Sequence, residues 1–295
     1  LLAESFDVSP ESDLPRGATY DHMRYAPNQL FASDGLGARY LVERRHYDAY
    51  QKARYARDPR SQDVLGAAQE AWLRSTIASS TATWKVVATS ISMTSMIVDA
   101  RRVPASLVGT PDEAAVTAGL NLFKSLLPTS YYLSVDQWDG FGDKRAELLS
   151  VLRSQPNCML LAGDIHSFYA TSHGKGDGQH GVVELTGGGI SSESFKGFVR
   201  RVVNGIVPGI MSDPNVAATV ENLEHLFRDN FAPLVYANND AHGFVAVSFG
   251  ATEANATLYV APIAHVEVEA GDVTTAAAPF EAIGFRAKDG ALTRT

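Results

Sequence analysis

Near the middle of the chain stands Cys158-Met159-Leu160-Leu161-Ala162, followed directly by Gly163-Asp164-Ile165-His166. A short apolar run that ends at a glycine is typical of a buried strand, and we expect one at 157–162. In open α/β sheets, polar residues just past the carboxyl end of a strand line the ligand crevice. Asp164 and His166 are therefore the first candidates for a functional site.

These two side chains have the chemistry of metal ligands. A carboxylate and a neutral imidazole both bind divalent and trivalent ions well. The alternative is structural, with Asp164 capping the next turn and His166 serving as polar surface. An Asp-x-His pattern is short, so its spacing alone leaves both interpretations open.

Helical and strand patterns alternate around this stretch. Apolar residues recur at helical intervals over 65–80 and 143–153. Residues 110–113 have the form of a capping box with Pro111 at the first helical position, so a helix is also expected from there to about Leu126. Further helices are expected at 193–206 and 214–229, and a loop at 131–142. Strands are expected at 39–47, 84–88, 182–186, 244–249, 257–263 and 279–287. This alternation predicts an α/β layered domain, with 1–29 as an irregular lead-in and a strand-rich end from about 244.

Composition narrows the possible functions. The 295 residues carry 33 acidic and 25 basic side chains, a net charge of −8, which repels polyanions, so no nucleic acid partner is expected. No window approaches the roughly 18 apolar residues of a membrane span, so none is predicted. The only cysteine, Cys158, lies in the apolar run and is expected to be an inert core residue. An acidic protein that binds a small anion needs basic side chains or metal ions at the site.

Two further places could contact a substrate. The segment 134–141 contains Asp136, Trp138 and Asp139, and a tryptophan in such a loop either walls a pocket or anchors the loop on the core. Arg44, expected at a strand end, could hold a phosphate or form a structural ion pair.

Other polar segments have a structural interpretation beside the functional one. The glycine-rich 187–192 could present backbone N–H groups to an anion, or form a turn whose serine caps the following helix. Residues 238–243 are expected to form a turn from which Asp240 and His242 could reach a site. His173 and His180 are expected to lie in a mobile loop at 172–181.

The order of several segments resembles the PhoD-like alkaline phosphatase family of metallophosphoesterases. Asp136-Gln137-Trp138-Asp139-Gly140-Phe141 and Gly163-Asp164-Ile165-His166 are the most specific of them. The resemblance extends over roughly 20–250 and includes Leu65–Leu73, Ala82–Val86, Val183–Ser192 and Asp240–Phe244.

The resemblance implies a layered αββα sandwich around a metal centre that hydrolyses phosphate monoesters and often diesters. It implies an iron ion with calcium, with zinc or manganese as other possible metals, and Asp164 and His166 as two metal ligands. Asp136 and Trp138 would line the pocket, Arg44 could contact the phosphate, and the protein would be periplasmic or secreted.

One feature of that family is absent. Its early ligands include a Trp-Asp-Asp-His-Glu type stretch, which this sequence lacks, and Thr89 and Ser90 stand where many relatives carry Asn or Gln. We therefore expect residues 30–295 to be the second half of the domain. The chain begins with Leu1 rather than Met, which indicates processing or a start midway through a longer product. The remaining ligands would come from an upstream segment or another chain, so the isolated chain should be inactive. No residue is assigned as nucleophile.

Two alternatives remain. The chain could be a non-catalytic binding or structural module that keeps the fold without the metals, as the missing ligands suggest. It could also be a different α/β hydrolase that uses Asp and His as acid and base without metal.

Overall fold

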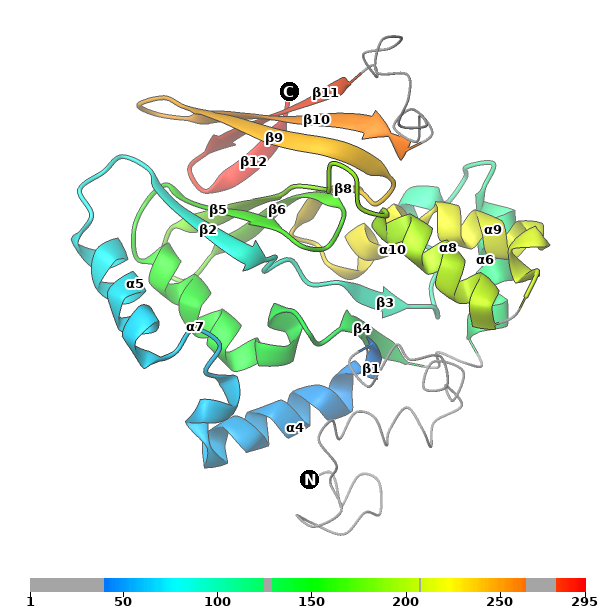
Figure 1. Ribbon diagram of the computed structural model, residues 1–295, viewed down its shortest axis with the longest axis horizontal. Helices are drawn as coiled ribbons and strands as arrows, with labels where there is room; N and C mark the ends of the chain where they lie inside the picture. The colour runs from blue at the N-terminus through cyan, green and yellow to red at the C-terminus, as the bar shows by residue number, and fades with distance from the viewer. Residues whose placement is uncertain (1–39, 125–128, 207, 264–279) are drawn as a thin grey trace. The chain divides into compact units, whose positions relative to one another are not determined.

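The computed structural model describes residues 40–124, 129–206, 208–263 and 280–295. They form two compact units, each assembled from separate parts of the chain (Figure 1). Unit 1 takes the described parts of Leu1–Gly66, together with Ser95–Ala146 and Val199–Phe231. Unit 2 takes Ala67–Thr94, Glu147–Phe198 and the described parts of Ala232–Thr295.

Unit 2 contains a mixed five-stranded sheet in the order β2-β5-β7-β6-β8. Its strands are β2 (Lys85–Ile91), β5 (Cys158–Gly163), β6 (Phe168–Lys175), β7 (Gly181–Thr186) and β8 (Leu234–Asn238). Strand β5 runs parallel to both β2 and β7, whereas β6 is antiparallel to β7 and β8. The apolar run of the sequence therefore lies inside the sheet, where such runs are expected.

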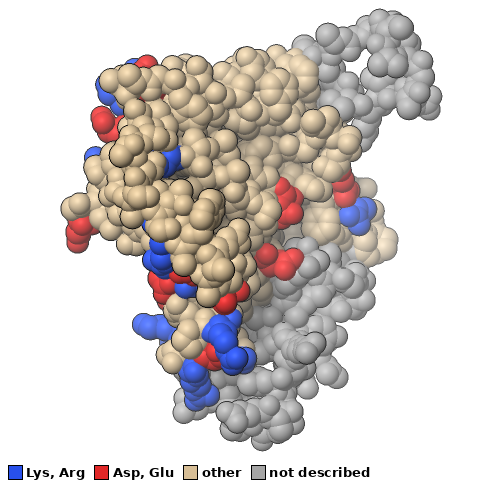
Figure 2. Space-filling view, turned by 60° about the vertical axis from the view of Figure 1, so that its left-hand side comes forward, with Lys and Arg blue, Asp and Glu red and all other residues tan. Residues whose placement is uncertain are grey.

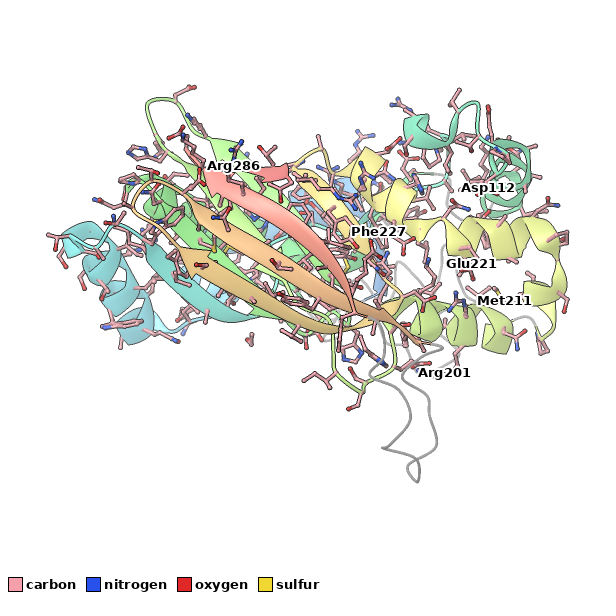
Figure 3. The ribbon with its side chains drawn as sticks, turned by 90° about the horizontal axis from the view of Figure 1, so that it is seen from above. Asp112, Arg201, Met211, Glu221, Phe227 and Arg286 are labelled. Atoms are coloured by element: carbon pink, nitrogen blue, oxygen red, sulfur yellow. The ribbon has the colours of Figure 1, made fainter. Side chains whose placement is uncertain are left out.

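A second sheet of unit 2 is antiparallel, in the order β12-β11-β10-β9. It consists of β9 (Ala241–Phe249), β10 (Ala254–Pro262), β11 (Glu281–Lys288) and β12 (Ala291–Arg294). The strands alternate between a buried face and an outer face, and the exposed Arg286 stands on β11 in Figure 3. Such alternation is typical of a sheet with one face on the core.

The two sheets of unit 2 share one apolar core. Met159, Phe168 and Leu185 come from the five-stranded sheet, and Leu258 and Phe285 from the four-stranded sheet. All five are no more than 1% exposed. Helix α5 (Ala67–Ser79) lies on the side of the five-stranded sheet away from β9–β12 (Figure 1). Helix α7 (Gly142–Arg153) begins in unit 1 and ends in unit 2, where Leu148, Leu149 and Leu152 are buried.

Unit 1 has a three-stranded antiparallel sheet in the order β1-β4-β3. The strands are β1 (Tyr40–Glu43), β3 (Ile97–Asp99) and β4 (Ser130–Ser134). Its helical segments are α4 (Arg44–Arg57), η1 (Pro59–Gln62), η2 (Ala105–Leu107), α6 (Glu113–Phe123), η3 (Trp138–Phe141), η4 (Ile210–Ser212), α9 (Pro214–Glu221) and α10 (Leu223–Asn230). Helix α8 (Phe195–Ile206) begins in unit 2 and continues into unit 1.

A glycine sets how closely two helices of unit 1 approach. A Cβ on Gly119 of α6 would come within 2.4 Å of the carbonyl oxygen of Asn215 on α9. Only a residue without a side chain allows this contact. The helices pack beside a core of Leu107, Val116, Leu120, Tyr131 and Leu226.

Most of the predicted elements are confirmed, including the helices at 65–80 and 143–153 and the strand at 157–162. Three were wrong. The strand expected at 39–47 ends at Glu43, because Glu43 accepts a hydrogen bond from the backbone N–H of His46 and caps α4. The loop at 131–142 begins with β4, and the loop at 172–181 begins inside β6. The lead-in expected at 1–29 lies outside the described residues.

On the face shown in Figure 2, Lys and Arg lie among Asp and Glu rather than in a field of one sign. In the described portion of the chain, every helix is too short or too polar to span a bilayer.

Candidate functional site

The turn between β5 and β6 presents two polar side chains to solvent. Asp164 and His166 are both exposed, whereas Ile165 between them is 4% exposed and anchors the turn in the core. The turn therefore leaves the Asp164 carboxylate and the His166 imidazole outside the packed interior, as a site at the end of a strand requires.

Both polar residues have a left-handed backbone, with φ of 72° at Asp164 and 52° at His166. This region is costly for residues other than glycine and persists only where surrounding contacts enforce it. Here the N–H of Ile165 donates to the carbonyl of Gly163 over 2.9 Å, and the N–H of Phe195 donates to the carbonyl of His166 over 3.1 Å. Residues held in this backbone region cluster at active sites and ligand clamps, and Asn157 and Asp289 also have a positive φ in this chain.

The imidazole of His166 is oriented by a backbone carbonyl. Its Nδ1 lies 2.6 Å from the carbonyl oxygen of Glu193. Because a carbonyl only accepts, Nδ1 must carry the proton, which leaves the lone pair of a neutral ring on Nε2. Metal-binding histidines commonly have this arrangement, with one nitrogen donating to the protein and the other facing the ion.

The carboxylate of Asp164 makes no hydrogen bond or ion pair with any residue in the described ranges. It is therefore available to an external ligand. The Asp164 carboxylate is an oxygen donor and the His166 imidazole a nitrogen donor, the two types of ligand that such a site would use.

Those two donors do not make a complete centre. Across the described ranges, no group of three or more His, Cys, Asp or Glu side chains converges as a metal site would require. A multinuclear centre would therefore need donors from elsewhere.

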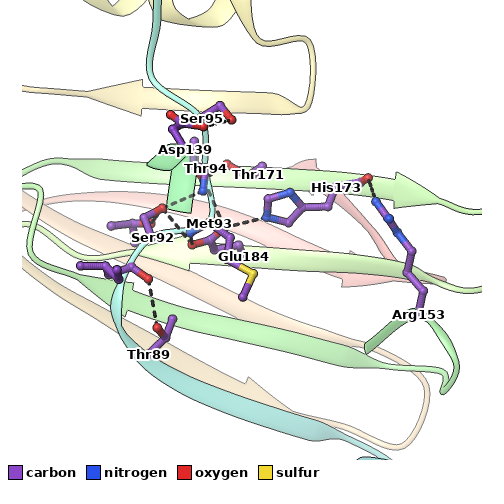
Figure 4. A network of polar contacts seen from close by, with 12 residues as sticks. Thr89, Ser92, Met93, Thr94, Ser95, Asp139, Arg153, Thr171, His173 and Glu184 are labelled. Carbon is purple, nitrogen blue, oxygen red and sulfur yellow. Dashed lines mark hydrogen bonds and ion pairs between the residues drawn. The ribbon is translucent and has the colours of Figure 1, made fainter. Parts of the chain in front are cut away.

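A buried polar network crosses the five-stranded sheet of unit 2 (Figure 4). Glu184 on β7 is fully buried and accepts hydrogen bonds from Ser92 Oγ and the Met93 N–H, both at 2.8 Å. It also accepts from Thr94 Oγ1 at 3.2 Å and from Nε2 of His173 at 2.6 Å. The carboxylate thus holds the segment that follows β2.

The charge of Glu184 is stabilised by these donors. Burial alone raises the pKa of the Glu184 carboxyl, but the hydrogen bonds from His173, Ser92 and Met93 outweigh burial and leave the pKa below its ordinary value. His173, which the sequence placed in a mobile loop, is instead buried in β6. The signal that could have found it is the run Phe168-Tyr169-Ala170-Thr171 before it, because aromatic and β-branched residues are enriched in strands.

The remaining predicted site residues lie in unit 1. Trp138 in η3 is 3% exposed, which matches the interpretation that it anchors the loop on the core. Asp136, two residues earlier, is exposed. Arg44 starts α4, where it pairs with Asp48 at 3.6 Å and lies over the ring of Tyr132. These contacts match the structural ion pair considered for Arg44. A role of the three residues in substrate binding stays a prediction.

Asp139 in the same segment is a structural residue. It is buried and accepts from Ser95 Oγ at 2.6 Å and from the Met96 N–H at 3.0 Å. Burial raises the pKa of the Asp139 carboxyl, although Arg145 and these hydrogen bonds oppose the rise.

The glycine-rich segment 187–192 packs tightly in unit 2. Gly187 donates its N–H to the carbonyl of Ala162 over 2.9 Å, and a Cβ on Gly188 would lie 2.6 Å from the ring of Phe168. The expectation that a serine of 187–192 caps α8 was wrong. The capping serine is Ser194, outside the segment, whose Oγ accepts from the N–H of Gly197 over 3.0 Å. These contacts favour the turn interpretation of the segment.

The sequence profile of the PhoD-like phosphatase family matches residues 27–258. The chain belongs to that family. Its predicted resemblance is confirmed, and so is the predicted α/β sandwich.

A structure of PhoD is among the solved structures that are similar to this PhoD-like chain. It aligns with 79% of the chain, with a TM-score of 0.47 and 18% sequence identity. The alignment covers 35% of that protein, so the present chain spans about a third of its length. Among curated proteins, none matches.

Proposed function

We propose that this chain contributes to a metal-dependent hydrolase of phosphate esters, with monoesters as its first substrate class and diesters as a second. The observation that carries the proposal is the turn after β5. There the exposed carboxylate of Asp164 lies two residues before His166, whose Nδ1 is hydrogen-bonded to the carbonyl oxygen of Glu193. Membership of the PhoD-like phosphatase family supports phosphate esters as the substrate class.

In the proposed site, Asp164 and His166 would each hold a metal ion through the carboxylate and Nε2. Iron with calcium is the combination we favour, with zinc or manganese as alternatives. The ions, when bound, would supply the positive charge that holds a phosphate and would lower the pKa of water. This local positive charge is needed because the chain carries a net charge of −8, which repels an anionic substrate.

The protein's own residues would orient and support this centre. Glu193 would hold the imidazole of His166 in the ligating tautomer. Asp136, Trp138 and Arg44 are proposed to contact the substrate. The other ligands would come from an upstream segment of the same protein or from another chain, and we propose a periplasmic or secreted location.

A second candidate is a non-catalytic module that retains the fold. The observation in its favour is that the described residues bring together no group of three or more potential ligands. In this case the chain would bind no metal even in its natural assembly.

Hydrolysis of p-nitrophenyl phosphate by the complete gene product, before and after chelation, tests the proposal. We expect activity that a chelator abolishes and added metal restores, and no activity from residues 1–295 alone. Activity that survives complete metal removal would favour acid–base chemistry without metal. A complete gene product with neither activity nor metal would favour the non-catalytic module.

A further inference from the structure

Two histidines of unit 2 bind consecutive backbone carbonyls. Nδ1 of His166 lies 2.6 Å from the carbonyl oxygen of Glu193, and Nε2 of His242 lies 2.6 Å from the carbonyl oxygen of Ser192. His166 follows β5, whereas His242 is the second residue of β9. One short piece of backbone therefore connects the two imidazoles.

This piece of backbone, the bridging segment Ser192–Lys196, is held on both sides. Towards the β5–β6 turn, the N–H of Phe195 donates to the carbonyl of His166 over 3.1 Å. Towards the β8–β9 turn, Ser194 Oγ donates to Asp240 Oδ1 over 2.8 Å, and the N–H of Lys196 donates to the carbonyl of Asn239 over 2.9 Å. The position of the Glu193 carbonyl thus depends on anchors from both turns.

The imidazole of His242 has one polar contact with the described residues. It is 6% exposed, and its Nδ1 is buried without a hydrogen-bond partner among the described residues. An unsatisfied buried nitrogen is unfavourable, and an apolar ring of similar size would avoid it. What the imidazole contributes here is therefore its Nε2–H, which holds the Ser192 carbonyl.

We propose that His242 is a positioning residue for His166. By fixing the carbonyl of Ser192, His242 orients the next peptide, so that the carbonyl of Glu193 faces Nδ1 of His166. The Nδ1–H tautomer of His166 then follows, with its lone pair on Nε2. The tautomer can be tested without metal, whereas its use in ligation rests on the proposed function.

The first test is the tautomer of each ring in the metal-free chain, read from imidazole 15N chemical shifts. The pH is raised until the 15N shifts themselves show that both rings are neutral. We expect a proton on Nδ1 of His166 and on Nε2 of His242. The opposite tautomer at either ring would overturn the proposal, and this result needs no variant.

The second test compares His242→Phe, His242→Gln and the control His180→Phe, which changes an exposed histidine. We expect His242→Phe to move the His166 proton from Nδ1 toward an equilibrium between both nitrogens. His242→Gln keeps an N–H donor and should retain more of the Nδ1–H form, and His180→Phe should match the wild type. An unchanged His166 tautomer in a folded His242→Phe protein would contradict the proposal.

Binding of Mn²⁺ alone to the complete gene product supplies the readout for ligation. Loss of a contact that orients a ligand costs about 10- to 100-fold in metal affinity, and we expect a loss of this size in His242→Phe. A wild-type protein that binds no metal would refute the proposed function, while the tautomer measurement would still decide the role of His242. Equal Mn²⁺ affinity in wild type and His242→Phe would overturn the link from His242 to ligation.

Discussion

The carboxylate of Glu184 and the imidazole of His173 meet inside the five-stranded sheet, with Oε2 and Nε2 2.6 Å apart and both side chains at most 2% exposed. Glu184 also receives the hydroxyl of Ser92 and the N–H of Met93. One buried acceptor therefore joins β6 and β7 to the segment that follows β2.

Replacing Glu184 by Ala should strongly destabilise unit 2. It leaves His173, Ser92 and the Met93 N–H buried without their acceptor, and removing one partner of such a buried contact costs about 3–5 kcal/mol. Urea unfolding measures the loss. The control is Glu281→Gln, an exposed change on β11 that should stay within about 0.5 kcal/mol of the wild type. Similar stabilities for both variants would contradict the role assigned to Glu184.

The stabilisation by Glu184 should depend on pH. Since the folded protein holds the pKa of this carboxyl below its ordinary value, its contribution is complete above that ordinary value and is lost as the pH falls through the folded pKa. Glu184→Gln resembles the protonated side chain in shape. The stability difference between wild type and Glu184→Gln should therefore shrink on acidification in unfolding curves. A difference that stays constant into the acid range would show that ionised Glu184 is not the stabilising form.

Phe285 should be a principal contact between the two sheets of unit 2. It is 1% exposed and packs 5.7 Å from the ring of Tyr236, so Phe285→Ala should cost about 3–5 kcal/mol in the free energy of unfolding. Phe280, which is 50% exposed, provides the matched control, because truncation of an exposed ring creates no cavity. Equal losses in the two variants would mean that the core is placed wrongly.

Cys158 should not react with thiol reagents while the protein is folded. Burial raises the pKa of its thiol to about 11, although Lys85 lowers it in part, and the residue is 1% exposed. Thiolate is the reactive form, so labelling should begin only on unfolding. Colorimetric thiol titration in buffer and in denaturant measures this. Rapid labelling of the folded chain would place Cys158 outside the core.

The sequence predicted the apolar centre of the fold better than its polar contacts. The run at Cys158–Ala162 identified β5, because a central strand needs little besides continuous apolar residues. The strand β6 was missed, since no strand was predicted over 168–175 and His173 and Gly174 give its end the composition of a loop. Its stability comes from Glu184, a tertiary partner that local patterns do not reveal.

The candidate site divides in the same way. Exposure of Asp164 and His166 could be predicted from their place after an apolar strand that ends in glycine. The hydrogen bond from His166 to Glu193 could not, because it joins residues 27 positions apart through a backbone carbonyl, and every residue type offers one. For His242, the sequence indicated proximity to a site but not its contact with Ser192.

The metal content of the purified complete gene product tests the central claim most directly. Elemental analysis would compare the wild type with the double variant Asp164→Asn/His166→Gln. The matched control is Asp177→Asn/His180→Gln, which makes the same changes at exposed positions between β6 and β7. We predict bound metal in the wild type and the control, and loss of most of it in the Asp164/His166 variant. Equal metal in all three proteins, or none in the wild type, would contradict the account.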